Sequence, residues 1–277
     1  MTRNMRDIQS EPDNRRIPID KAGIRHLQYP IVVLDRENKR QPTVADIGLY
    51  VDLPHNFKGT HMSRFIEVIN EHRGLISLRS IETILTNIIQ KFDSSTAHLE
   101  IRFPYFVEKV APVSGARSLM NYQCAFLATL DRRRRPVRPD LVVEVTVPVA
   151  TLCPCSKAIS DQGAHNQRSW VTIQIRSVEL VWIEELITMA ESAASSSLYS
   201  LLKREDEKFV TEYAYRHPRF AEDLARAVAQ KLRADARVVW FKVESENQES
   251  IHNHNAYAMV TGGRQRRRRA VSAKASN

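Results

Sequence analysis

The sequence predicts an α+β fold made of two copies of one module, because the same order of elements occurs twice along the chain. Each half contains two runs typical of strands, two amphipathic helical runs and two further strand-like runs. The halves show no clear residue-by-residue identity, so the repeat lies in the order of the elements. Elements in this order favour layers of helices packed on sheets.

The first half predicts two strands, two helices and two strands. Their ranges are 31–35, 44–53, 61–73, 77–92, 95–110 and 117–130. The second strand alternates apolar and polar residues, as a half-buried strand does. Both helices carry apolar residues at helical spacing; Thr60 offers an N-cap to the first, and Gly74 would end it.

The second half repeats this order. Its predicted strands and helices are 140–150, 169–177, 181–192, 219–234, 237–247 and 256–261. Pro218 introduces the second helix. Residues 195–218 are additional material, rich in acids and bases, that has no counterpart in the first half.

Bulk composition points to an ordinary globular protein. The 277 residues are 43% hydrophobic and 26% charged, which is enough for a substantial core. No apolar run approaches the roughly 20 residues of a membrane span, and the first residues lack the apolar core of a signal peptide. Three cysteines do not make a disulfide framework. We therefore expect a cytoplasmic protein with no membrane partner.

The net charge of +9 is concentrated near the C-terminus. After Glu249 there are no acidic residues, and six of the arginines and lysines follow it, so about +3 remains for the rest of the chain. A second basic run, residues 131–140, lies between two predicted strands and is interpreted as a connector. Neither run has the interleaved aromatics of a base-stacking surface, so no specific nucleic acid is expected.

These patterns divide the chain into four segments. The predicted segments are a flexible N-terminal segment (1–25), a first module (26–135), a second module (136–262) and a basic disordered tail (263–277).

The most unusual stretch is residues 148–169, which holds Cys153, Cys155 and His165. Thiolate and imidazole are good ligands for divalent ions, and a structural zinc site would normally require C-x2-C pairs, which are missing here. An open metal site with a bound water fits better, provided that a carboxylate comes from elsewhere in the chain. Buried or incidental cysteines remain an equally open interpretation from composition alone.

Two other stretches are chemically dense. Residues 242–260 contain Glu249 and His252 in a predicted loop, where a solvated polar turn is the usual outcome. Lys58, His61 and Arg64 surround a glycine before a predicted helix, where free backbone amides favour anions. Exposed basic residues beside a helix cap explain this second group equally well.

Four motifs together resemble GTP cyclohydrolase I of type IB. They are "FKGTHMSRF", "LCPCSKAIS…GAHNQRS", "LLKREDEKFVTE" and "ESIHNHNAYA", in family order across about residues 20–261. The resemblance implies a tunnelling fold of tandem ββααββ modules, whose antiparallel sheets assemble into a barrel. It also implies a homotetramer with active sites between subunits.

The resemblance further implies conversion of GTP and water to formate and 7,8-dihydroneopterin triphosphate, the first step towards tetrahydrofolate. The reaction would begin with attack of metal-activated water on purine C8. By matching position, Cys153, His165 and Glu207 are the implied ligands of a manganese, iron or zinc ion, and His252 is the implied proton-transfer residue.

The implied substrate-binding residues complete this assignment. Glu249 and Glu222 are alternative partners for guanine, because a carboxylate can accept two N–H bonds from the N1 and 2-amino edge. Lys58, His61 and Arg64 are the candidates for the triphosphate. For Cys155 a structural role and ligation beside Cys153, which would be strained, both stay open, and the basic tail is not part of the family pattern.

Two other functions stay open on the sequence alone. The tunnelling fold also includes a nitrile reductase of queuosine biosynthesis, which uses a nucleophilic cysteine and a nicotinamide cofactor. The grouping of Cys153, His165 and Glu207 favours metal-dependent hydrolysis over that reaction. A basic nucleic-acid-binding protein with a structural metal is the third possibility; it predicts salt-sensitive binding without the tail.

Overall fold

The computed structural model describes residues 9, 11–72 and 76–263 of the chain. Within them the strands are β1 (Ile19–Asp35), β2 (Lys39–Leu53), β3 (Thr96–Val110), β4 (Arg117–Asp131), β5 (Asp140–Leu152), β6 (Asn166–Ser177), β7 (Ser196–Ser197), β8 (Val238–Gln248) and β9 (Ala256–Gly263). The helices are α1 (Ser63–Glu71), α2 (Leu78–Phe92), α3 (Pro154–Ile159), α4 (Ile183–Glu191), α5 (Arg204–Arg216) and α6 (Ala221–Ala234). Every predicted strand and helix is present, which confirms the α+β prediction.

The strands described by the structure form one sheet with antiparallel pairing. Its order is β1-β2-β3-β4-β5-β6-β8-β9, and the short strand β7 pairs with β5. The predicted boundary between the modules, at 135/136, falls in the connection from β4 to β5, and the two strands pair across it. Strands β1 and β9 are the two ends of this order, so the sheet is open in the single chain.

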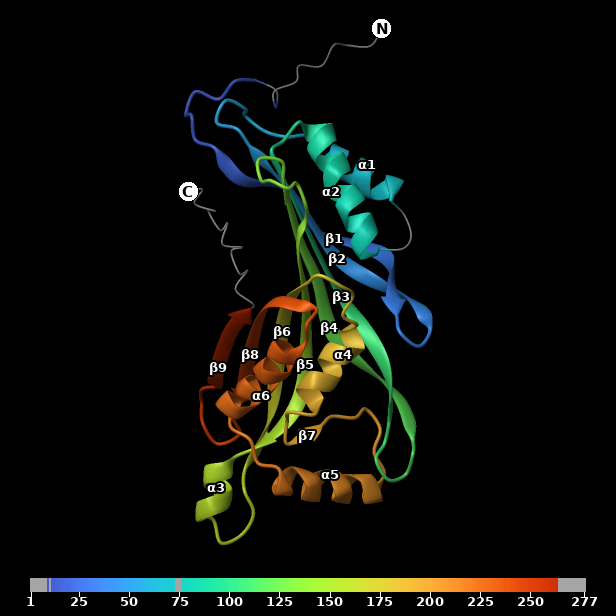
Figure 1. Cartoon of the computed structure of the whole chain (residues 1–277), viewed down its shortest axis with the longest axis vertical. Helices are drawn as coiled ribbons and strands as arrows, with labels where there is room; N and C mark the ends of the chain where they lie inside the picture. The colour runs from blue at the N-terminus through green and yellow to red at the C-terminus, as the bar shows by residue number, and fades with distance from the viewer. Residues whose placement is uncertain (1–8, 10, 73–75, 264–277) are drawn as a thin grey trace, which may run out of the picture.

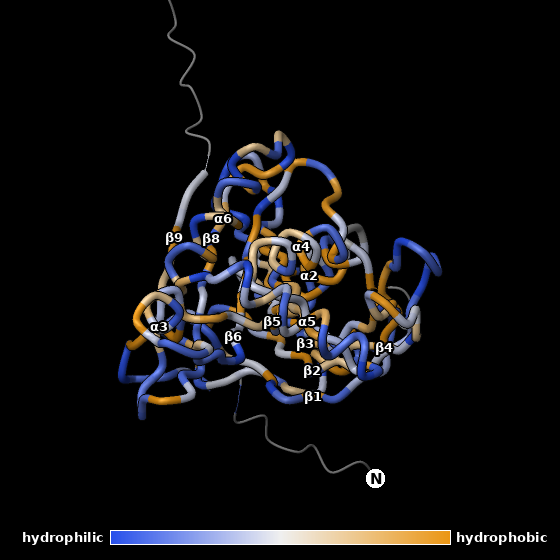
Figure 2. Tube along the Cα trace, turned by 90° about the horizontal axis from the view of Figure 1, so that it is seen from below, coloured by the Kyte–Doolittle hydropathy of each residue, from blue (hydrophilic) through white to orange (hydrophobic). Residues whose placement is uncertain are grey.

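The helices α1, α2, α4 and α6 cover one face of this sheet (Figures 1 and 2). Valine, isoleucine and leucine side chains from alternate strand positions meet the apolar sides of these helices and form the core. Phe65 of α1 stacks on Phe92 of α2 at 4.2 Å between ring centroids. The opposite face carries charged side chains that pair across strands, such as Arg102 with Glu144 at 3.1 Å.

Helix α4 joins the two modules through two carboxylates. Glu184 accepts a hydrogen bond from the Tyr105 hydroxyl at 2.7 Å, and Glu191 accepts one from the Tyr122 hydroxyl at 2.8 Å. Both tyrosines belong to the first module and are fully buried. Burial and these carboxylates raise the pKa of each phenol well above its ordinary value. The tyrosines therefore stay protonated and act as hydrogen-bond donors.

Two predictions about the N-terminal part of the chain were wrong in detail. Strand β1 begins at Ile19, so residues 19–25 belong to a strand and not to a flexible segment. Helix α1 begins at Ser63 after Met62, and Thr60 does not cap it. Thr60 is buried, and its carbonyl accepts a hydrogen bond from the Gln9 side chain. Helix α1 ends at Glu71; Gly74, the predicted stop, lies outside the described residues.

Two helices were not predicted. Helix α3 occupies the cysteine-containing stretch that the sequence suggested was a loop, and α5 occupies part of residues 195–218. In Figure 1 both lie at the same end of the molecule, beyond the ends of β5 and β6. They form the end of the fold where the candidate ligands lie.

Candidate active site

The candidate site starts where β5 ends. Cys153 directly follows β5 and caps α3, and its sulfur accepts a hydrogen bond from the amide of Ser156 at 3.4 Å. Pro154 fits the first helical position, where no backbone donor is needed. Cys155 is one residue into the helix and is exposed to solvent. The tight Cys-Pro-Cys spacing thus places the two sulfurs in different environments.

His165 lies beside Cys153, immediately before β6. The Cys153 amide donates to the His165 carbonyl at 3.1 Å, which extends the β5–β6 ladder by one pair. The His165 amide donates to the hydroxyl of Ser156 at 3.2 Å. These contacts join the start and the end of the segment that contains α3. The backbones of Cys153 and His165 therefore lie side by side, and their role as ligands stays a prediction.

Two acceptors face one nitrogen of the His165 ring. The side-chain oxygen of Gln167 lies 3.1 Å from Nδ1, and a carboxylate oxygen of Glu249 lies 3.9 Å from the same nitrogen. The side chains of His165 and Glu249 are only 15% and 9% exposed. The sequence suggested Glu249 as a guanine-binding residue, and Gln167 was not considered. Gln167 could have been found from its position two residues after His165 on a strand, where side chains share one face.

A row of buried polar residues lies next to the site. Each of the three neighbouring strands carries a buried polar residue two positions from a residue of the site. These are Thr151 on β5, two before Cys153; Gln167 on β6, two after His165; and Asn247 on β8, two before Glu249. The hydroxyl groups of Thr151 and Ser169 lie 2.7 Å apart. Such a row is unusual on a face that is otherwise apolar, and it makes this end of the sheet polar beneath the candidate ligands.

Glu207 does not complete the site within one chain. The described part of the chain contains no group of three or more His, Cys, Asp or Glu side chains that could hold a metal. Glu207 is exposed in the first turn of α5, and that end of the helix lies beside the β3–β4 connection (Figure 1). The three-ligand set therefore stays a prediction.

The start of α5 is firmly attached by the neighbouring residue, Asp206. Its buried carboxylate accepts hydrogen bonds from the amides of Val113, Ser114 and Lys203 at 2.8 to 2.9 Å, and from the Ser114 hydroxyl. Burial raises the pKa of this carboxyl, but these hydrogen bonds outweigh burial and hold the pKa well below its ordinary value. Helix α5 is therefore fixed to the β3–β4 connection.

The lowered pKa of Asp206 predicts a loss of stability in acid. Its contribution is present above the ordinary value of 3.8 and is lost as the pH falls towards the lower pKa of the folded state. Asp206→Asn should lower the melting temperature clearly at about pH 7 and less at about pH 2, well below the ordinary value of 3.8. Thermal unfolding at both pH values checks this, with the exposed Glu205→Gln as the control. An equal effect at both pH values would contradict it.

His252 and Glu222 approach the same end from other elements. His252 lies in the connection from β8 to β9, which begins at Glu249, and its ring stacks on that of His254 with centroids 5.2 Å apart. Glu222 is in the first turn of α6. The amide of Arg219 donates to the carbonyl of Leu152 at 3.0 Å, which holds the start of α6 against the end of β5.

Lys58 and His61 precede α1 and Arg64 lies in its first turn, and α1 is at the end of the molecule opposite α3 (Figure 1). His61 and Arg64 line a cavity of about 140 Å³, and Lys58 forms an ion pair with Glu11 at 3.2 Å. Within one chain, these basic residues and the Cys153–His165 pair are not brought together. A shared site would need a second copy of the chain.

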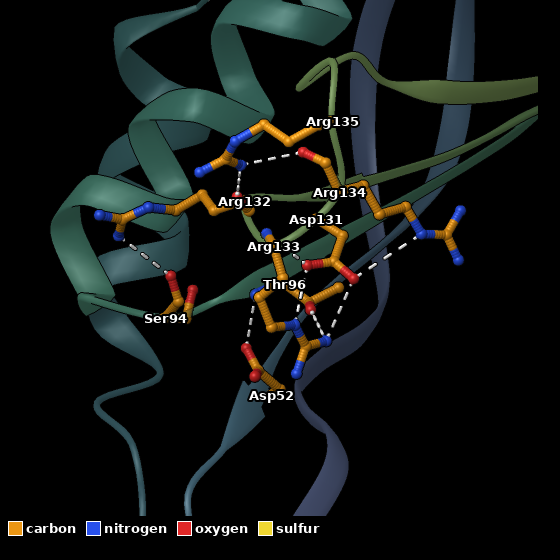
Figure 3. A network of polar contacts seen from close by, with 8 residues as sticks. All are labelled: Asp52, Ser94, Thr96, Asp131, Arg132, Arg133, Arg134 and Arg135. Carbon is orange, nitrogen blue, oxygen red and sulfur yellow. Dashed lines mark hydrogen bonds and ion pairs between the residues drawn. The ribbon is translucent and has the colours of Figure 1, made fainter.

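The predicted connector, residues 131–140, spans the connection between β4 and β5, and Figure 3 shows its first part. Asp131 accepts hydrogen bonds from the amide and the side chain of Arg133, both at 2.9 Å, and Arg133 also donates to Thr96. Arg135 donates to two backbone carbonyls of the same run. The prediction that this run is a connector is confirmed, since its arginines hold the turn together.

The donors at the candidate site suit a divalent metal ion. A thiol and an imidazole come from adjacent strand ends, and a carboxylate lies 3.9 Å from the imidazole. Sulfur, nitrogen and oxygen together are accepted by zinc, iron and manganese. Cys153 and His165 therefore fit the predicted ion as two of its ligands.

Comparison with known proteins identifies close relatives. The family model described as "Type I GTP cyclohydrolase folE2" matches residues 5–258. The chain is 54% identical over 256 residues to the GTP cyclohydrolase FolE2 of Syntrophotalea carbinolica, covering 92% of this chain and 94% of that protein. It is 50% identical over 260 residues to the GTP cyclohydrolase FolE2 of Kosmotoga olearia, covering 94% and 99%.

Solved structures with the same fold are more distant in sequence. The uricase of Arthrobacter globiformis has a TM-score of 0.54 at 10% identity, covering 90% of this chain and 95% of that one. The urate oxidase of Bacillus subtilis 168 has a TM-score of 0.50 at 10% identity, covering 88% and 98%. At this identity the likeness concerns the fold alone, and it confirms the predicted tunnelling fold.

Proposed function

The chain belongs to the type I GTP cyclohydrolase folE2 family, and from this premise we propose that it converts GTP and water to formate and 7,8-dihydroneopterin 3′-triphosphate. This reaction is the first step of tetrahydrofolate biosynthesis, and we place it in the cytoplasm. No helix in the described residues is long and apolar enough to cross a membrane. The proposal rests on the Cys153–His165 pair, found in a chain whose relatives are named GTP cyclohydrolase FolE2.

We propose that Cys153 and His165 hold a manganese, iron or zinc ion, with Glu207 as a third ligand. A divalent ion can lower the pKa of a bound water from 15.7 to about 7, which would supply the nucleophile for purine C8. The buried environment of His165, 15% exposed, keeps bulk water away from one side of the site. His252, on the connection that begins at Glu249, is our candidate for the later proton transfers.

The geometry favours Glu222 over Glu249 as the guanine-binding carboxylate. Glu249 faces His165 at 3.9 Å and is nearly buried, whereas Glu222 is exposed in the first turn of α6. An exposed carboxylate is available to accept two hydrogen bonds from the N1 and 2-amino groups of guanine. Glu249 is then assigned to holding the ring of His165.

We propose that neighbouring copies complete each site in a homotetramer. Within the described part of its own chain Glu207 forms no metal-holding group with the pair, and Asp206 ties the start of its helix to the β3–β4 connection. Lys58, His61 and Arg64 lie at the far end of the same chain. A second copy can supply both the third ligand and the basic residues for the triphosphate. The two end strands of the sheet, β1 and β9, are available to extend it into a barrel.

Removal and return of metal test this proposal. Protein stripped of metal should release no formate from GTP, and addition of manganese, iron or zinc should restore formate and the fluorescent pterin product. Elemental analysis must accompany each assay. Full activity in protein shown to be metal-free would refute the metal-dependent mechanism. Reduction of a nitrile with a nicotinamide cofactor, in place of GTP hydrolysis, would support the alternative enzyme, which no observation here favours.

The basic tail is expected to be dispensable for this activity. Residues 264–277 carry six positive charges and show no apolar periodicity, and they lie outside the described residues. A chain truncated after Gly263 should therefore assemble and turn over GTP like the longer chain. Size-exclusion chromatography and the formate assay check this. A smaller assembly or a loss of activity would mean that the tail has a role in this enzyme.

A further inference from the structure

The ring of His165 has two hydrogen-bond acceptors on one side. The side-chain oxygen of Gln167 lies 3.1 Å from Nδ1, within hydrogen-bond distance, and an oxygen of Glu249 lies 3.9 Å from the same atom. Ionised carboxylate oxygens and amide oxygens accept hydrogen bonds but do not donate them. A nitrogen that faces two acceptors is most stable when it carries the proton.

We propose that Gln167 is a positioning residue that fixes His165 in the tautomer protonated on Nδ1. This tautomer leaves the lone pair on Nε2, which is the atom that a metal ion would bind. The inference rests on the proposed function only in assigning His165 as a ligand. The tautomer itself is a property of the metal-free chain and is measured without substrate.

The backbone holds Gln167 in place for this role. Gln167 is 8% exposed on β6 and lies opposite Thr151 on β5. His165 and Gln167 are two residues apart, so their side chains extend from the same face of the strand. Gln167 pairs with β5, and the pairing of β6 with β8 begins at the next residue, Arg168. A side chain on a paired, buried strand has little freedom to move away from the ring.

Glu249 and Gln167 have different parts in this arrangement. Gln167 is close enough for a direct hydrogen bond, whereas Glu249 at 3.9 Å contributes mainly its negative charge. An amide beside the ring fixes the proton on Nδ1 without adding a second charge to a nearly buried pair. The carboxylate is thereby left to stabilise the ring once a cation is bound on its other side.

The tautomer is tested by nitrogen NMR of metal-free protein with labelled histidines. The His165 signals, assigned by comparison with His165→Asn, should show the Nδ1-protonated form in the original chain. Gln167→Leu should shift them towards the Nε2-protonated form or a mixture, while Gln167→Glu, which keeps an acceptor, should retain the original form. An Nε2-protonated His165 in the unmodified metal-free chain would overturn the inference, whatever the variants do.

Metal affinity is the second readout. Loss of an outer partner of a ligating histidine typically weakens metal binding about 10- to 100-fold, so Gln167→Leu should bind Zn²⁺ or Mn²⁺ weaker by that factor. Gln167→Glu, which keeps an acceptor at this position, should bind the ion more tightly than Gln167→Leu. Gln248→Leu is the matched control, since Gln248 is exposed on the neighbouring strand β8.

The two possible failures are distinguishable. If the original chain binds no metal, the proposed metal mechanism fails, while the NMR result still decides the tautomer. If it binds metal and Gln167→Leu binds equally well, with an unchanged His165 tautomer, Gln167 has no positioning role. Circular dichroism of each metal-free variant shows whether it is folded. If a variant does not fold, the NMR spectrum of the original chain alone decides whether His165 has the proposed tautomer.

Discussion

Cys153→Ser is expected to lose its metal and nearly all GTP cyclohydrolase activity while it stays folded. Serine is not deprotonated near neutral pH, so it is a poor replacement for a thiolate ligand. Loss of an outer partner of a metal ligand already costs about 10- to 100-fold, so loss of a direct ligand should exceed roughly 100-fold. Metal content and the fluorescence of the pterin product are the measurements.

The fold supplies a reason why this variant should stay intact. Cys153 caps α3, and its sulfur accepts a hydrogen bond from the Ser156 amide. Serine is among the best residues for this capping position. The replacement therefore keeps or improves the local hydrogen bond, and a loss of activity cannot be attributed to a lost cap. Circular dichroism should be unchanged.

Cys155→Ser is the matched control, one residue into the same helix. Cys155 is exposed, so its sulfur has little packing to lose, and we expect near-normal metal content and turnover. The opposite result, in which Cys155→Ser loses both and Cys153→Ser keeps both, would mean that the assignment of the two sulfurs is reversed.

The elements that the sequence predicted well are those with one buried face. Strands β3, β4 and β5 alternate buried residues with less buried ones over much of their length, and the predicted ranges match them closely. The early part of β1 was missed because it is exposed, and its pairing is irregular between Ile24 and Leu27. Alternation cannot mark a strand that has no buried side.

Helix α5 was missed for a related reason. Of its side chains, only Asp206 and Ala214 are buried, so there is no apolar stripe to detect. A polar contact to the β3–β4 connection holds it, and that contact joins residues more than 90 positions apart. Long-range hydrogen bonds of this kind leave no periodic signal in a sequence.

The candidate site was predicted in part. The short segment between Cys153 and His165 has to turn back on itself between two strands, so the sequence alone suggested that they meet. The resemblance to a family supplied Glu207 and His252, and the structure tests neither role. The position of Glu249 beside His165 depends on the pairing of β6 with β8, which no local pattern specifies.

Activity is expected to return when two inactive variants, Cys153→Ser and Glu207→Gln, are combined in mixed oligomers. If a neighbouring copy supplies Glu207, some sites in the mixture contain an intact cysteine from one chain and an intact glutamate from the other. Random mixing of equal amounts leaves roughly one site in four intact, so about a quarter of the original activity should appear. Formate release from oligomers formed by co-expression, purified through a different tag on each variant, is the measurement.

The same experiment has an unambiguous negative result. If each chain supplied both residues to its own site, no mixture of the two variants would contain an intact site, and activity would stay at the level of the single variants. That outcome would require the start of α5 to move within its own chain. Such a movement would break the hydrogen bonds from Val113 and Ser114 to the buried carboxylate of Asp206. Because those bonds fix the helix away from Cys153 and His165, we expect complementation. A mixture of the double variant with either single variant is the control, since it can form no intact site.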